Sequence, residues 1–344
     1  MPTVPPNCEL LLKPEDDYNH PPDDASNFNE SMYFSVFDRR QSMGGWYRLG
    51  NRVNEGYAEM SVCWYLPDGR VAFMAARPEI DSNERMDAGG LRFEIVAPLK
   101  RQRVTYEGGL CLLERPEEMA DPSRAFRENP IVPARMEIEH SAASQCPGGE
   151  VMQADGTPLP IDPEKTFGKA HFDQQTFGSG YLELDGRRFE LHGEGARDKT
   201  WGPRYWQSID WYRWLHFYVS PDCSVMATVI SEEGGGSGVS GFVFQGGPEG
   251  GCHEVEEGQI TSLMDEDGYL RSFDFNMRSE GREYEIHGDV LSLIPLRNRR
   301  AKPDGSMMVT RIMEAMTEFT CNGERALGMA EYLDQIVDGR PIGE

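Results

Sequence analysis

The fold is indicated most clearly by two stretches, Tyr269-Leu-Arg-Ser-Phe-Asp-Phe-Asn276 and Glu283-Tyr-Glu-Ile-His287, in which apolar and polar residues alternate. Alternation with a period of two is typical of a β-strand that buries one face. Arg188-Phe-Glu-Leu-His192 repeats the pattern, and turn sequences such as Leu66-Pro-Asp-Gly-Arg70 separate strands of this kind. The sequence therefore predicts closely spaced antiparallel hairpins.

Patterns typical of long helices are scarce, and Pro116–Phe126 is the segment that fits one short helix. The 37 glycines suit strand corners and close approach of strands. Closing a sheet into a barrel also removes its exposed edges. We therefore predict an all-β protein built of antiparallel β-barrels.

The distribution of acidic, proline and glycine residues divides the chain into segments. Residues 1–30 contain seven acids and one base, Lys13, so we expect an extended acidic arm over the surface. Residues 141–164 are rich in Pro, Gly and Ser, as linkers are. This predicts β domains at 31–140 and 165–335, followed by a tail at 336–344.

The overall charge limits the classes of partner. The chain has 34 Lys and Arg against 58 Asp and Glu, a formal charge of −24, which argues against nucleic-acid binding and against anionic membrane surfaces. The seven cysteines are isolated and predict reduced thiols rather than a disulfide framework. Since no apolar run is long enough for a membrane span, we expect a soluble, cytoplasmic protein.

Residues 193–218 form a tryptophan-rich segment that also carries many charges. Four of the six tryptophans, Trp201, Trp206, Trp211 and Trp214, lie here, and seven acidic, basic or histidine residues lie between positions 197 and 216. Aromatic walls with ionisable groups are typical of a pocket that holds an apolar molecule and performs acid–base chemistry. The alternative is an aromatic core or a domain interface whose charges face water.

If residues 210–218 form one strand, its alternate side chains share a face. That face carries Asp210, Tyr212, Trp214, His216 and Tyr218, and an inward orientation in a closed barrel would enclose a cavity. Alternatively, the tyrosines bond the backbone and Asp210 faces solvent. Two alternatives are open for Asp198, which lies upstream of this strand. If it is buried beside an arginine, its pKa is lowered and its role is structural; if it is buried among the tryptophans, its pKa is raised and it could donate a proton.

These considerations give two groups of candidate site residues. The candidate catalytic residues are Asp198 or Asp210 as the acid and His216 or Tyr212 to orient water. The candidate substrate-binding residues are Trp201, Arg204, Trp206, Trp211, Trp214, Tyr218, His171 and Gln174. We predict no metal and no cofactor, because no zinc or calcium ligand spacing and no nucleotide-binding loop occur.

The tryptophan-rich segment also carries a family resemblance. Gly193-x-Gly-x-Arg-Asp-Lys-Thr-Trp-Gly-Pro-Arg-x-Trp206, His171-Phe-Asp-Gln174 and Gly328-Met-Ala-Glu-Tyr332 resemble the carotenoid 1,2-hydratase (hydroxyneurosporene synthase)-like superfamily, in a bacterial branch. The resemblance implies two consecutive lipocalin-like β-barrels. It also implies cofactor-free chemistry on terpenoid or polyketide-derived molecules, since members include alkene hydratases and pericyclic cyclases.

The leading functional hypothesis is a cofactor-independent lyase, a hydratase or dehydratase, acting on an apolar, terpenoid or polycyclic substrate. Protonating an alkene needs a carboxylic acid that keeps its proton near neutral pH and aromatic faces around the resulting cation. One alternative is a non-catalytic carrier of an apolar small molecule, and another is a cofactor-free cyclase or isomerase. The substrate, the direction of the reaction and the oligomeric state are left open.

Overall fold

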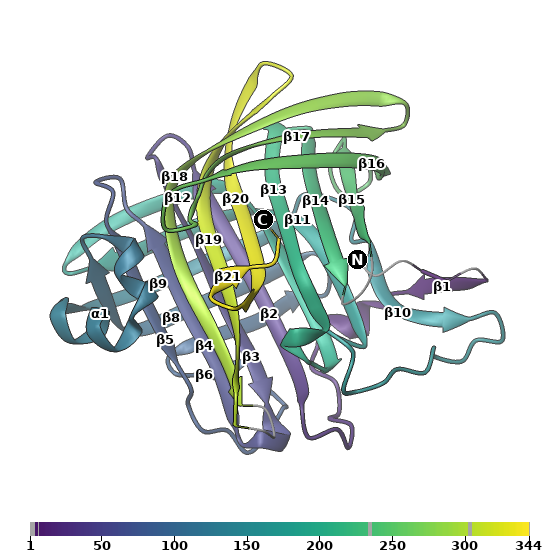
Figure 1. Cartoon of the computed structure of the whole chain (residues 1–344), viewed down its shortest axis with the longest axis horizontal. Coiled ribbons are helices and arrows are strands. Elements are labelled where there is room, and N and C mark those ends of the chain that lie inside the picture. Colours follow the sequence, from purple (N-terminus) through teal and green to yellow (C-terminus); the bar gives the residue numbers. More distant parts are fainter. Residues whose placement is uncertain (1–3, 6, 233–235, 302–304, 344) are drawn as a thin grey trace. The chain divides into compact units, whose positions relative to one another are not determined.

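The structure is a computed structural model that describes residues 4–5, 7–232, 236–301 and 305–343 (Figure 1). The chain divides into two compact units: unit 1 is Met1–Leu112 with Asn129–Tyr205, and unit 2 is Leu113–Glu128 with Trp206–Glu344. Strands make up 66% of the structure and helices 7%, which confirms the predicted all-β class.

In its described part, unit 1 contains one twelve-stranded antiparallel sheet with two short 3-10 helices. Its strands are β1 (Cys8–Leu11), β2 (Phe28–Asp38), β3 (Met43–Arg52), β4 (Tyr57–Tyr65), β5 (Val71–Ala76), β6 (Asp87–Ala88), β7 (Leu91–Ala97), β8 (Arg101–Leu113), β9 (Ile131–Ala142), β10 (Gly148–Gln153), β11 (Ala170–Leu184) and β12 (Arg187–Pro203). The 3-10 helices are η1 (Pro14–Asp17) and η2 (Val53–Glu55). The strand order is β1-β10-β11-β12-β2-β3-β4-β5-β8-β7-β6, and β9 pairs with both β8 and β11, which joins the central run into a circuit.

Unit 2 is a closed eight-stranded antiparallel barrel, because β13 pairs with both β14 and β20. Its strands are β13 (Ile209–Ser220), β14 (Cys223–Glu232), β15 (Ser237–Gln245), β16 (Gly251–Met264), β17 (Leu270–Ser279), β18 (Arg282–Ala301), β19 (Met307–Cys321) and β20 (Glu324–Val337), with β21 (Arg340–Pro341) added at β20. The helical elements are η3 (Pro116–Ala120), α1 (Pro122–Glu128) and η4 (Trp206–Ser208), so the short helix predicted at 116–126 is confirmed.

Each unit has its own apolar core. In unit 1, alternate residues of β2 such as Met32 and Phe34 pack with side chains from the other strands of the circuit. In unit 2, Leu215 and Phe217 of β13 pack with side chains from the other strands of the closed barrel. The opposite residues of each strand therefore point away from these interiors.

The two glycines of the Gly193-x-Gly motif have a packing role. A Cβ at Gly193 would lie 2.1 Å from the carbonyl oxygen of Phe37, and one at Gly195 would lie 1.9 Å from that of Ser35. Neither distance is sterically possible, so these positions allow β12 to lie close against β2.

The division of the chain differs from the domain boundaries expected from the sequence. The expected linker at 141–164 lies within unit 1, because its β10 pairs with both β1 and β11. The strands β11 and β12, expected in the C-terminal domain, also belong to unit 1, where β12 pairs with β2. Composition marked the polar segment correctly but could not show that it contributes a strand.

The acidic arm also differs from the expectation of a surface segment. Asp17 in η1 and Glu30 at the start of β2 are fully buried. Both carboxyl groups lie against cations of β12, as described below, so the arm is part of unit 1.

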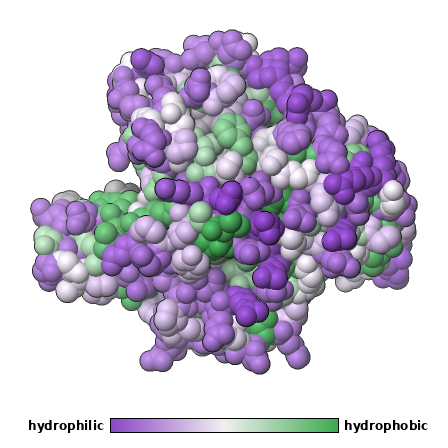
Figure 2. All heavy atoms as spheres, turned by 180° about the vertical axis from the view of Figure 1, so that it is seen from behind, coloured by the Kyte–Doolittle hydropathy of each residue, from purple (hydrophilic) through white to green (hydrophobic). Residues whose placement is uncertain are grey.

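The face in Figure 2 is covered mostly by hydrophilic residues, in keeping with the formal charge of −24. Among the described helices, none is long and apolar enough to cross a membrane.

Candidate functional site

The strand β12 carries charged residues on both of its faces in unit 1. Arg197 and Lys199 pair with Phe34 and Met32 of β2, and directly paired residues share a face, so both cations point to the apolar interior. Asp198 lies between them and points to the opposite, outer face. The alternation of the strand thus separates one acid from its two cationic neighbours.

On the outer face, four residues form what we call the Asp198 cluster: His171, Asp173, Asp198 and Thr200. Asp173 pairs directly with Asp198, and His171 pairs directly with Thr200, across β11 and β12. His171 Nε2 lies 3.0 Å from Asp173 Oδ2, and His171 Nδ1 lies 2.9 Å from Thr200 Oγ1. Asp198 Oδ2 is 4.0 Å from His171 Nδ1. The imidazole therefore has polar partners at both ring nitrogens.

The electrostatics of this cluster raise the pKa of its Asp198 carboxyl group. Burial raises the pKa of Asp198, the facing Asp173 raises it further, and His171, Arg204 and Arg48 oppose the shift without cancelling it. Burial alone would lower the pKa of His171, but the carboxylates of Asp173 and Asp198 outweigh it and raise this pKa. The His171 and Asp198 side chains remain 27% and 28% exposed, so solvent or a ligand can reach them.

Aromatic residues stand beside the acid on the same face. Tyr33 of β2 pairs directly with Asp198, and the rings of Tyr33 and Trp46 lie 6.0 Å apart in a stacked arrangement. Trp46 Nε1 donates to the hydroxyl oxygen of Tyr65 at 3.1 Å, which fixes the indole. The acid thus has one aromatic neighbour, Tyr33, which in turn stacks on Trp46, and neither is among the tryptophans that the sequence hypothesis named.

The same side chains are also the ones that could hold a metal ion. His171, Asp173 and Asp198 each offer one donor atom, and these atoms lie within 4.8 Å of one another. Sequence spacing gave no sign of this grouping, because the donors come from two strands. Both ring nitrogens of His171 already have hydrogen-bond partners, so a metal would have to displace one of them.

The inner face of β12 forms a second polar group, which we call the arm network. Arg197 Nη1 donates to Asp17 Oδ1 at 2.7 Å, and Arg197 Nε donates to Gln174 Oε1 at 2.9 Å. Lys199 Nζ donates to Glu30 Oε1 at 2.6 Å. Burial by itself would raise the pKa of Glu30, but Lys199 and His20 outweigh it and lower this pKa. Gln174, predicted to bind substrate, thus orients a buried arginine.

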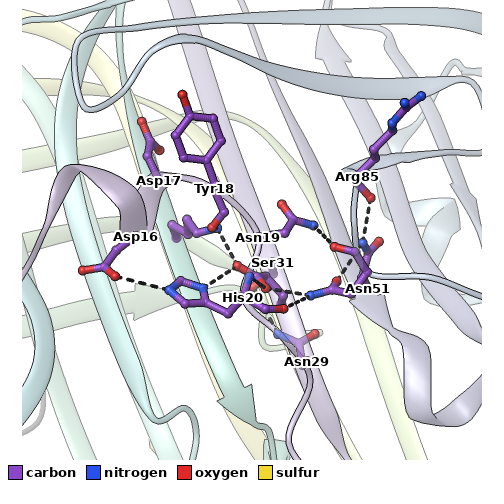
Figure 3. Close-up of polar contacts among 12 residues, drawn as sticks. Asp16, Asp17, Tyr18, Asn19, His20, Asn29, Ser31, Asn51 and Arg85 are labelled. Carbon is purple, nitrogen blue, oxygen red and sulfur yellow. Dashed lines mark hydrogen bonds and ion pairs between the residues drawn. The ribbon is translucent and has the colours of Figure 1, made fainter.

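The arm network extends to the histidine and asparagine side chains shown in Figure 3. His20 Nδ1 lies 2.9 Å from Glu30 Oε1, and its Nε2 lies 3.4 Å from Asp16 Oδ1. The imidazole also stacks on Trp201, with ring centroids 4.3 Å apart. Trp201 is therefore part of the inner face, with a packing role, and does not stand beside Asp198.

Arg204 is the other candidate of unit 1. Its guanidinium lies over the Phe167 ring, with Cζ 4.4 Å from the ring centroid. It is buried and contributes positive charge near Asp198, which opposes the rise in the pKa of that carboxyl.

In unit 2, β13 is a single strand as predicted, but its faces are oriented differently from the expected cavity. Leu215 and Phe217 point into the barrel interior, so Tyr212, Trp214 and His216 lie on the outer face. The reason is that the apolar side chains at odd-numbered positions of β13, such as Leu215 and Phe217, fill the barrel interior. Tyr218 shares the outer face and is buried.

The outer face of β13 still gathers groups capable of acid–base chemistry. The hydroxyl of Tyr212 donates to Glu331 Oε1 of β20, and Glu331 pairs directly with Trp214. The rings of Trp214 and His216 lie 4.8 Å apart. Sequence reasoning quoted Glu331 within the motif Gly328-Met-Ala-Glu-Tyr332 but gave it no role at the site. It lies more than a hundred residues from Tyr212 along the chain and becomes its neighbour only through barrel closure.

The remaining candidates of unit 2 are placed apart from that group. Trp211 lies at the inner face, where Arg213 Cζ is 5.0 Å from its ring centroid. The carbonyl of Trp206 accepts a hydrogen bond from Gln335 Nε2 at 3.0 Å. Asp210 is partly buried. The segment predicted as one lining is therefore divided between the two units, with Asp198 in unit 1 and Asp210 in unit 2.

Together, the fold and its site define an all-β protein of two units, with a partly exposed acid–histidine cluster on one sheet. The chain belongs to the family described as Domain of unknown function (DUF7064), whose model matches residues 13–336. No curated protein matches the sequence.

Solved structures share the fold over nearly the whole chain. An AttH-like protein (NE1406) of Nitrosomonas europaea is similar over 97% of this chain and 98% of its own, with a TM-score of 0.61 and 12% identity. CghA in complex with Sch210972 is similar over 97% and 100%, with a TM-score of 0.55 and 10% identity. Kievitone hydratase of Nectria haematococca is similar over 96% and 93%, with a TM-score of 0.54 and 8% identity. At these identities, the likeness concerns the fold.

Proposed function

We propose that the protein is a cofactor-independent lyase that adds water to, or removes water from, an apolar molecule of terpenoid or polycyclic type in the cytoplasm. The observation that supports this most directly is the Asp198 carboxyl group, whose pKa is raised by burial and by the facing Asp173 while a quarter of the side chain stays accessible. The hydratase among the proteins of similar fold is consistent with such chemistry.

In the direction of hydration, protonated Asp198 transfers its proton to one alkene carbon, whose π electrons form the new C–H bond. The neighbouring carbon is left as a cation and accepts a lone pair from water. The Asp198 carboxylate then takes the proton that the bound water releases, so the acid is regenerated and one water is added overall. Dehydration runs through the same steps in reverse.

The neighbours of Asp198 have supporting roles in this proposal. His171, fixed by Asp173 and Thr200, is a rigid polar group that orients the water. Tyr33, which pairs directly with Asp198, is the aromatic group that stabilises the cation, an interaction of about 2 kcal/mol when desolvated. The Tyr212–Glu331 pair of unit 2 is the alternative acid, and we propose that Trp214, His216 and Tyr218 contact ligand there.

The experiment is a survey of apolar alkenes and tertiary alcohols incubated with the protein in H2 18O, analysed by mass spectrometry. We expect an alkene to gain one labelled water, or an alcohol to lose water or exchange its oxygen. Asp198→Asn is expected to lower turnover by about 10²–10⁴-fold, the usual contribution of a general acid, while ligand binding persists. Prior dialysis against a chelator is expected to leave turnover unchanged.

Two variants distinguish the competing acids. Glu331→Gln removes the unit 2 carboxyl group at nearly constant shape, and Glu139→Gln is a control that makes the same change at a partly exposed position of β9. If Glu331→Gln abolishes turnover and Asp198→Asn does not, the acid is wrongly assigned. Saturable binding of an apolar ligand without any turnover would identify a carrier, and an isomeric product without water incorporation would identify a cyclase or isomerase.

A further inference from the structure

One end of the unit 2 barrel concentrates positive charge in a strongly acidic protein. Residues 291–311 contain four arginines and one lysine but a single acid, Asp304, against 34 bases and 58 acids in the whole chain. Residues 291–301 lie in β18 and residues 307–311 lie in β19, two neighbouring strands of the barrel wall. The charge is therefore local and not a property of the surface in general.

The strand registers align four of the residues at this end in one row. Trp211 of β13 pairs with Asp334 of β20, Asp334 pairs with Arg311 of β19, and Arg311 pairs with Arg297 of β18. Met313, two residues from Arg311, is a member of the unit 2 core. The row therefore continues the interior face past the last core layer, at the mouth of the barrel.

Two arginines stand directly opposite each other in this row, an arrangement that is destabilising unless an anion offsets it. The only carboxylate in the row, that of Asp334, accepts a hydrogen bond from Arg213 Nη2 through Oδ1 at 2.8 Å, and its Oδ2 has no hydrogen-bond partner among the described residues. Arg311 Nε and Nη2 are shielded from water and have no hydrogen-bond partner among the described residues. Unsatisfied buried donors are costly, so an external acceptor would be stabilising.

Aromatic rings flank the same positions. Arg311 Cζ lies 5.8 Å from the centroid of the Tyr269 ring, and Trp211 ends the row on the other side. The nearest acids to Tyr269 belong to the turn before β17, where Asp265 Oδ2 is 2.5 Å from Arg271 Nη2. The acidic turn is thus at least partly neutralised by a separate arginine.

We propose that Arg297 and Arg311 form a binding site for an oxyanion, a phosphate or carboxylate group of a small ligand, at the mouth of the unit 2 barrel. Guanidinium groups bind both kinds of oxyanion through paired N–H donors. Tyr269, whose ring centroid lies 5.8 Å from Arg311 Cζ, is the aromatic neighbour of a ligand held there. The proposal does not depend on the chemistry at Asp198, which lies in the other unit.

The test is calorimetric titration of the full-length protein with inorganic phosphate and, separately, with benzoate at a moderate ionic strength of about 0.1 M. We expect saturable binding of at least one of them. Arg311→Gln and Arg297→Gln should each weaken this binding by about tenfold or more, as loss of a charged hydrogen bond does. Preference for phosphate would assign a phosphorylated ligand, and preference for benzoate would assign a carboxylate.

Arg300→Gln is the matched control, because it removes the same charge from the same strand on the opposite face. Its affinity should stay within about twofold of the wild type, since long-range charge effects are small at moderate salt. Equal weakening in all three variants would show a nonspecific charge effect and overturn the site. Absence of saturable binding of both anions to the folded wild type would overturn it as well.

Discussion

The charged side chains on the two faces of β12 differ in burial and in their partners, although they are neighbours in the sequence. On the inner face, Arg197 and Lys199 are almost completely buried and each contacts a carboxylate, of Asp17 and Glu30 respectively. On the outer face, Asp198 is partly exposed and faces another acid, Asp173, with His171 as its nearest cationic group. Each inner cation thus contacts a carboxylate at 2.7 Å or less, whereas the Asp198 carboxyl group lies 4.0 Å from the His171 ring nitrogen.

This difference indicates which charges serve stability and which are available for chemistry. A buried ion pair holds both groups in their charged forms, so neither can exchange a proton near neutral pH. An acid opposite another acid keeps its proton more readily and can donate it. Charge density alone therefore does not identify a catalytic segment, since pairing decides the role.

The largest expected effect is on the inner face. Arg197→Gln leaves the Asp17 carboxylate buried without its guanidinium, and we expect a loss of about 3–5 kcal/mol in the free energy of unfolding. The measurement is urea denaturation. The double variant Arg197→Met with Asp17→Leu should recover much of this loss, because it leaves no unpaired charge. An equal loss in both variants would show that packing, and not charge balance, holds the arm.

The Glu30–Lys199 pair gives a prediction with a pH dependence. The pKa of Glu30 is lowered in the folded state, so the stabilisation from this carboxylate is complete above its unfolded pKa and is lost as pH falls through the folded value. Lys199→Met removes the main attraction. Its deficit in melting temperature should be greatest near neutral pH and should shrink in acid, where Glu30 is protonated. A deficit independent of pH would contradict the ionic role.

The contribution of Asp198 to stability should change with pH in the direction opposite to that of Glu30. Its pKa is raised in the folded state, so ionisation of this group destabilises the fold as pH rises through the window between its unfolded and folded values. Asp198→Asn should therefore raise the melting temperature at neutral pH and leave it unchanged well below pH 4, where the carboxyl is protonated in both states. A lower melting temperature at neutral pH would show that Asp198 is a structural ion-pair partner.

The smallest expected effect concerns the aromatic contact of the arm. His20→Phe keeps a ring over Trp201 and removes the contact with Glu30, whereas His20→Ala removes both. We expect His20→Ala to cost about 0.5–1.5 kcal/mol more than His20→Phe in the free energy of unfolding, the usual range for an aromatic pair. Indistinguishable values for the two variants would show that the stacking contributes little.

Local patterns were sufficient to predict the fold class. Period-two alternation and Asp-Gly turns predicted the hairpins, because each depends on residues close in the sequence. The position of the division between the units was not predictable in this way. It depends on the pairing of β12 with β2, where Asp198 meets Tyr33 from the other end of unit 1.

The candidate site was predicted in part, for a related reason. Asp198 and His171 were both named from the sequence, and the structure brings them together through the register of β11 and β12. Asp173 was within the motif His171-Phe-Asp-Gln174 but carried no distinguishing local signal. Glu331 was within the motif Gly328-Met-Ala-Glu-Tyr332, but its place beside Tyr212, like that of Trp46 beside Tyr33, could not be found without knowledge of strand pairing. Trp201 was misplaced because alternation puts it on the inner face with Lys199.

The most direct test of the account is the titration of the Asp198 carboxyl group itself, by carbon NMR of protein labelled at its aspartate carboxyl carbons. Asp198→Asn assigns the signal by its disappearance. We predict an apparent pKa clearly above the ordinary aspartate value of about 3.9, and a downward shift of that pKa when Asp173 is replaced by Asn. A pKa at or below the ordinary value would contradict the claim that the outer face of β12 holds a proton-donating acid.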